Sequence, residues 1–81
     1  MSREEILNSL TGVLRELMGD DDFEVSEEMS LVDDLDLDSL EIMELVMQIE
    51  DNFSITVGED KMTEFALVKD VVDYIEQETA K

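Results

Sequence analysis

Residues 33–41 hold the densest set of groups in the sequence that could do chemistry, with five carboxylates around one serine hydroxyl. Alternating aspartates are typical of the first ligands in an EF-hand calcium loop. Here they are Asp34, Asp36 and Asp38. However, Ser39 stands in place of the glycine of such a loop, and Leu45 stands in place of its bidentate glutamate. We therefore expect no dedicated metal site, only weak and nonspecific binding of divalent cations by the acids.

The hydroxyl of Ser39 is the uncharged reactive group of this stretch. The chain contains no His and no Cys, so Ser39 lacks the usual base, and we expect no catalytic residues. At the start of a helix this hydroxyl could instead accept a group delivered by another enzyme. A phosphodiester there would meet free backbone N–H groups and the positive end of the helix dipole. The alternative is that Ser39 only caps the helix.

The charge of the chain limits the partners it can have. Its 81 residues, enough for a single domain over residues 1–81, carry 24 acids and 5 Lys or Arg, a net charge of −19. This charge excludes a basic surface for nucleic acid, disfavours anionic membranes and favours basic protein partners. Leu, Ile, Val and Phe supply 26 residues, enough for a small core. With no Cys, no signal peptide and no apolar membrane span, we expect a cytoplasmic protein.

Apolar spacing predicts helices over residues 3–18, 39–53 and 67–77. Ser2 and Glu5 form a candidate capping box for the first helix, and Gly19 fits its left-handed end. Residues 54–66 are ambiguous, with one helical turn within 59–64, and the tail from Gln77 to Lys81 is expected to fray.

The long connection over residues 19–38 needs internal order to fit a small domain. Its apolar residues are expected to anchor it on the core. They are Phe23, Val25, Met29, Leu31, Val32, Leu35 and Leu37. Ser30 followed by Asp33 could cap one short turn within it.

The helix predicted over residues 39–53 carries two apolar stripes, although a surface helix needs only one. The core face consists of Ile42, Leu45, Val46, Ile49 and Phe53. The second stripe, beside an acidic arc, consists of Leu40, Met43 and Met47. This second stripe either packs on the long loop or forms a docking surface, for which flexible methionine is well suited.

Several segments in order resemble the acyl carrier protein family. Asp38-Ser39-Leu40 is similar to its phosphopantetheine attachment motif, and Ser30–Leu35 resembles the segment that precedes that motif. Three further stretches resemble its recognition helix and its last helix. They are Glu44–Met47, Ile49–Phe53 and Val71–Ile75. The resemblance implies an all-α fold, a four-helix bundle with a long loop between helices 1 and 2 and a short third helix.

The same resemblance implies roles for particular residues. Ser39 would bear a covalent 4'-phosphopantetheine arm that holds acyl groups as thioesters, and Asp38 would help the phosphopantetheinyl transferase and its metal ion to engage. The docking face would consist of Leu40, Glu41, Met43, Glu44, Met47, Glu50 and Asp51. Its partners would be acyl-transferring, condensing or acyl-activating enzymes of fatty-acid, lipid or polyketide biosynthesis that have basic patches.

We expect a monomeric, non-catalytic carrier. The alternatives are an aminoacyl, peptidyl or D-alanyl carrier, and an unmodified acidic interaction module.

The chain also departs from the family pattern. Asp36 stands where the family often has Gly, and Gly58 stands where it often has Pro. The run Ala66-Leu67-Val68 stands where Thr-Thr-Val usually opens the last helix, so the usual Thr cap is missing. Met62 and Phe65 stand where smaller residues often line the acyl pocket. Such bulk favours short or polar cargo, or long chains left on the surface. Alternatively, Met62 turns outward and Phe65 only replaces another core residue.

Overall fold

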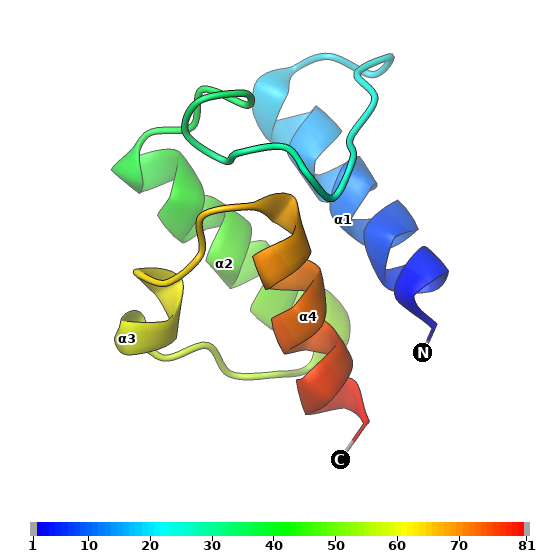
Figure 1. Cartoon of the computed structure of the whole chain (residues 1–81), viewed down its shortest axis with the longest axis vertical. Helices are drawn as coiled ribbons and strands as arrows, with labels where there is room; N and C mark the ends of the chain where they lie inside the picture. The colour runs from blue at the N-terminus through cyan, green and yellow to red at the C-terminus, as the bar shows by residue number, and fades with distance from the viewer. Residues whose placement is uncertain (1, 81) are drawn as a thin grey trace.

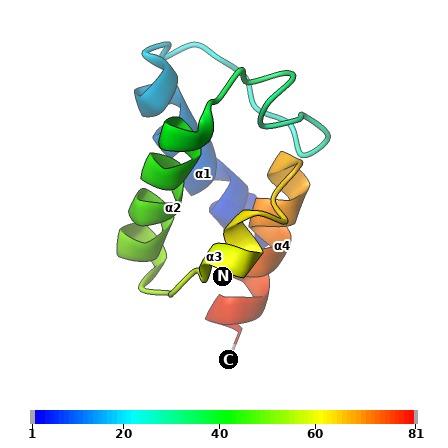
Figure 2. The same ribbon diagram turned by 90° about the vertical axis from the view of Figure 1, so that its left-hand side faces the viewer.

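The computed structural model describes residues 2–80, and within them the chain forms four helices (Figure 1). They are α1 (Arg3–Met18), α2 (Ser39–Phe53), α3 (Glu59–Met62) and α4 (Val68–Thr79). The first helix packs against both α2 and α4. The short α3 lies on the side of the bundle away from α1, as Figures 1 and 2 both show. The predicted helical bundle, with its long first loop and short third helix, is confirmed.

The caps predicted for α1 are present. The Glu5 N–H donates to the Ser2 Oγ over 3.2 Å, and the Ser2 N–H donates to Glu5 Oε1 over 3.3 Å. Gly19 ends the helix in the left-handed region with φ 70°. These local signals are why the bounds expected from the sequence match those of the helix.

Three helices and the long loop share one apolar core. Its buried side chains from α1 are Ile6, Leu10, Val13 and Leu14. Those from α2 and α4 are Leu45, Val46, Ile49, Phe53, Val68, Val71, Val72 and Ile75. Those from the loop are Leu31, Leu35 and Leu37. The loop is therefore anchored on the core, as the sequence predicted.

Backbone hydrogen bonds also tie the loop to the start of α4. The Leu31 N–H donates to the Ala66 carbonyl over 3.0 Å, and the Val68 N–H donates to the Met29 carbonyl over 2.9 Å. The expected short turn is present as well, because the Asp33 N–H donates to the Ser30 Oγ over 3.1 Å. This pairing holds the long loop across one end of the bundle.

Two expectations about these segments are wrong. Val32 is exposed rather than an anchor, because it lies within the turn while its neighbour Leu31 takes the core position. The fourth helix continues through Thr79 instead of fraying from Gln77. There the Thr79 hydroxyl donates to the Ile75 carbonyl over 2.8 Å and closes the last turn. Lys81 lies outside the described residues.

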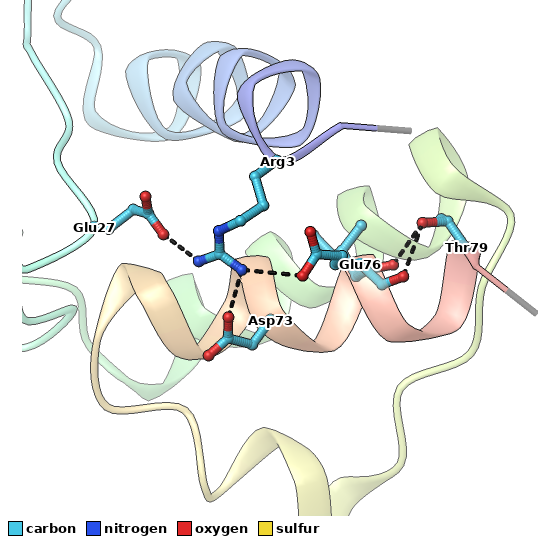
Figure 3. Close-up of polar contacts among 6 residues, drawn as sticks. Arg3, Glu27, Asp73, Glu76 and Thr79 are labelled. Atoms are coloured by element: carbon cyan, nitrogen blue, oxygen red, sulfur yellow. Dashed lines mark hydrogen bonds and ion pairs between the residues drawn. The ribbon is translucent and has the colours of Figure 1, made fainter.

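A cluster of ion pairs around Arg3 joins α1, the loop and α4 (Figure 3). Its guanidinium Nη1 lies 2.5 Å from Asp73 Oδ1 and 3.2 Å from Glu76 Oε1, and its Nη2 binds Glu27. The hydrogen bonds that Arg3 donates to Glu27 and, to a smaller extent, to Asp73 raise the pKa of Arg3 above its ordinary value. We call this set the Arg3 cluster.

Candidate functional site

Ser39 is the first residue of α2, and the residue before it caps the helix. Asp38 Oδ1 accepts from the Glu41 N–H over 2.8 Å, and the Asp38 N–H donates to Glu41 Oε1 over 3.2 Å. Ser39 itself is exposed, and within residues 2–80 its hydroxyl makes no hydrogen bond. The alternative in which Ser39 only caps the helix is therefore wrong, and its hydroxyl is free to react with an incoming group.

The backbone just before this site makes a sharp reversal. Asp36 has φ 56°, a left-handed conformation that favours glycine but that aspartate tolerates. Leu35 and Leu37 on either side of it are buried, and the Leu37 N–H donates to the Leu31 carbonyl over 3.0 Å. These contacts fix the reversal, which places Ser39 at the surface.

A groove of about 370 Å³ opens beside Ser39, and we call it the α2 groove. Its lining is mostly apolar and comes from Val32, Ser39, Ile42, Met43, Met62, Thr63 and Phe65. Met62 and Phe65 are half-buried. Met62 therefore lines the groove rather than turning away from it. Val32, which leaves the core, also faces this groove, a placement that apolar spacing alone did not reveal.

The second apolar stripe of α2 is exposed. The exposed fractions are 67% for Leu40, 50% for Met43 and 64% for Met47. The loop does not cover these side chains, so the interpretation that the stripe packs on the loop is wrong. Large apolar side chains left in water on one helix face are typical of an interaction surface.

Carboxylates lie beside the exposed stripe. Glu44 and Asp51 are exposed, and with Met47 and Gln48 they line a shallow hollow of about 250 Å³. None of the α2 carboxylates forms an ion pair within the described part of the chain. We call Leu40, Met43, Glu44, Met47 and Asp51 the α2 face.

Two other acids predicted for docking have partners inside the chain. Glu41 completes the capping box with Asp38, and Glu50 Oε2 accepts from the Val57 N–H over 2.9 Å. Both are half-buried. Their role toward partner proteins stays a prediction, whereas their local role is to hold the start of α2 and the segment that follows its end.

The aspartates around Ser39 point to separate backbone donors rather than to one centre. Asp34 Oδ2 accepts from the Ser30 N–H over 2.7 Å, and Asp38 caps α2. Within residues 2–80, no three His, Cys, Asp or Glu side chains are placed to hold a metal ion. None of the described helices is long and apolar enough to cross a membrane.

The sequence model of the phosphopantetheine attachment site family matches residues 8–75. An acyl carrier protein of an Exiguobacterium species is 45% identical over 76 residues, which cover 94% of this chain and 96% of that protein. The chain belongs to the acyl carrier protein family. The acyl carrier protein of Thermotoga maritima is 40% identical, with 94% of both chains covered.

Solved structures of the family have the same fold. A crystal structure of an acyl carrier protein from Thermotoga maritima matches with a TM-score of 0.84 at 28% identity, covering 96% of this chain and 91% of that one. The solution structure of a holo acyl carrier protein from Geobacter metallireducens matches with a TM-score of 0.80 at 27% identity. It covers 91% of this chain and 85% of that one.

Proposed function

We propose that Ser39 carries a 4'-phosphopantetheine arm whose thiol holds acyl groups as thioesters for enzymes of fatty-acid, lipid or polyketide biosynthesis. The observation that carries this proposal is an exposed hydroxyl, free of hydrogen bonds within residues 2–80, at the start of α2 and beside an apolar groove. The arm supplies the thiol, which this chain lacks. The related structure from Geobacter metallireducens, a holo acyl carrier protein, supports the same chemistry.

Loading requires another enzyme, because nothing in this chain can activate the hydroxyl. The Ser39 oxygen attacks the pyrophosphate of coenzyme A, a phosphodiester bond forms, and adenosine bisphosphate leaves. The hydroxyl proton passes to a base of the phosphopantetheinyl transferase, since the chain has no His. Asp38 keeps one carboxylate oxygen free of the cap bond, and this oxygen would engage the transferase and its metal ion.

The product fits its position electrostatically. A phosphodiester on Ser39 lies at the N-terminal end of α2, where the helix dipole and free N–H groups favour negative charge. The chain itself is then a carrier and not a catalyst. It would work in the cytoplasm, where coenzyme A and the transferases that use it are found.

The α2 face would dock the enzymes that load and use the arm. Its apolar side chains offer contact area, and its carboxylates attract basic patches at a distance. The net charge of −19 strengthens this attraction and makes it sensitive to salt. Partners therefore include the transferase and acyl-transferring, condensing or acyl-activating enzymes.

Intact mass spectrometry tests the proposal. The chain is incubated with a phosphopantetheinyl transferase, coenzyme A and Mg²⁺, and we expect one arm per chain. Ser39→Ala should gain nothing, whereas Ser26→Ala, which removes another exposed hydroxyl from the long loop, should load like the wild type. An equal mass gain in Ser39→Ala would contradict the assignment of the site. No gain in the wild type would favour the unmodified interaction module.

A further inference from the structure

Two cavities of this protein share one wall. The first is the α2 groove beside Ser39, and the second is a hollow of about 200 Å³ between α3 and α4, which we call the α4 hollow. Besides Phe65, the α4 hollow is lined by Lys61, Glu64, Asp70, Asp73, Tyr74 and Gln77. Among the described residues, Phe65 is the one that lines both cavities. Phe65 therefore lies between the mostly apolar cavity and the polar one.

The Phe65 ring is held in place on the side of α4. It meets the Tyr74 ring edge to face, with ring centroids 5.8 Å apart and an angle of 66° between the planes. Tyr74 is itself fixed, because its hydroxyl donates to the Thr56 carbonyl over 2.6 Å. Phe65 also packs against the buried core. By contrast, Met62 is an unbranched side chain that can rearrange, on a helix of a single turn.

An alkyl chain is favoured on one side of this wall and disfavoured on the other. In the α2 groove it would leave water for mostly apolar surroundings, and each methylene group would add to the stability of the loaded form. In the α4 hollow it would displace water from three carboxylates and an ammonium group. The chain therefore gains nothing by continuing past the ring, even if the ring could move.

Resting on the proposed attachment of the arm to Ser39, we infer that the Phe65 ring sets the length of acyl chain that this protein can shelter. Chains up to that length lie in the α2 groove, and the carbons beyond it stay on the surface. Replacing the ring by a small side chain frees the half-buried volume that the ring fills against the core, so that a longer chain can stay in apolar surroundings before it reaches the polar hollow.

The experiment measures melting temperature against acyl length. Wild type, Phe65→Ala and the milder Phe65→Leu are loaded with butyryl, hexanoyl, octanoyl, decanoyl or dodecanoyl arms, and loading is checked by intact mass. In the wild type we expect the melting temperature to rise by a few degrees per methylene and then stop rising at a defined length. In both variants the rise should continue for at least one longer member of the series. Because the readout is the length at which the rise stops, a lower starting stability does not obscure it.

Two controls isolate the wall. Met62→Ala widens the same groove without touching the α4 hollow, and Phe23→Ala removes a half-buried ring from the long loop. In both variants the melting temperature should stop rising at the same acyl length as in the wild type. The inference is overturned if the melting temperature of the Phe65 variants stops rising at the same acyl length as that of the wild type. It is also overturned if Met62→Ala shifts this limiting length as much as the Phe65 variants do, or if the wild type shows no limiting length. In those cases normal arm loading would leave the carrier function standing. Failure of the wild type to load would refute the proposed function, and the inference with it.

Discussion

Carboxylates form ion pairs in the Arg3 cluster, whereas those of the α2 face form none within the described residues. Around Arg3, one guanidinium binds three carboxylates from the loop and α4, and this joins segments that are far apart in the chain. On the α2 face, the acids lie beside exposed apolar side chains and form no ion pair within residues 2–80. No Lys or Arg occurs anywhere in α2. The comparison shows that the chain uses Arg3 to hold the framework and leaves one face charged.

Arg15 and Lys61 also form their contacts outside the α2 face. Arg15 Nε donates to the Phe23 carbonyl over 2.6 Å and fastens the first part of the loop to α1. Lys61 lies in α3, and its Nζ is 3.5 Å from Oε2 of Glu64, just after that helix. Positive groups near the α2 face would weaken the field that attracts a basic partner, so their placement elsewhere favours docking.

Breaking the Arg3 cluster should have the largest effect on folding. Arg3→Gln leaves three partly exposed carboxylates together without their cation, and we expect the melting temperature to fall by a few degrees. The control is Lys69→Gln, which removes the same charge from a side chain that forms no ion pair among the described residues. Thermal melts at low salt compare the two. Equal losses would mean that only net charge matters.

Reversing a charge on the α2 face should change binding and leave the fold intact. Glu44→Lys should slow the loading of Ser39 by a basic transferase about tenfold at low salt, because the steering field is lost. Glu16→Lys makes the same change on the exposed side of α1 and should have a much smaller effect. Loading reactions quenched at set times, over a series of salt concentrations, measure both rates. A Glu44→Lys rate equal to that of Glu16→Lys at every salt concentration would refute electrostatic docking.

The smallest expected effect concerns the reversal before Ser39. Asp36→Gly should raise the free energy of unfolding by about 1 kcal/mol, because glycine adopts the left-handed backbone without strain. Asp36→Asn removes the same charge while keeping a side chain, so it should gain less, and Asp36→Ala should lose stability. Urea unfolding ranks the three variants. If Asp36→Ala stabilised the protein as much as Asp36→Gly, the loss of charge rather than the relief of backbone strain would explain the gain.

Local signals explain how much of the fold could be predicted from the sequence. The bounds of α1 and α2 follow from apolar spacing and from the capping pairs that begin with Ser2 and Asp38. The exposed stripe of α2 also follows from a helical wheel, which left Leu40, Met43 and Met47 off the core face. The predicted helix start also agrees with the structure, in which Ser39 is exposed as the first residue of α2.

Tertiary contacts explain what the sequence could not show. The partners of Arg3 are 24, 70 and 73 residues away, so no local pattern reveals the cluster. Val32 directly follows the core residue Leu31 in the sequence, and only the turn that contains it decides that it faces the α2 groove. Likewise, no local pattern shows that Phe65 lines two cavities. Its ring meets that of Tyr74, whose hydroxyl donates to the Thr56 carbonyl of another segment.

The proposed attachment of the arm to Ser39 adds a group at the start of α2 and should leave the Arg3 cluster as it is. Amide correlation spectra of the ¹⁵N-labelled protein, before and after arm loading, test it most directly. We predict shifts concentrated at the start of α2 and along the α2 groove, from Ser39 to Met43 and at Met62, with the amides of Arg3 and Asp73 unmoved. Shifts centred on another serine, or spread evenly through α1 and α4, would contradict the account.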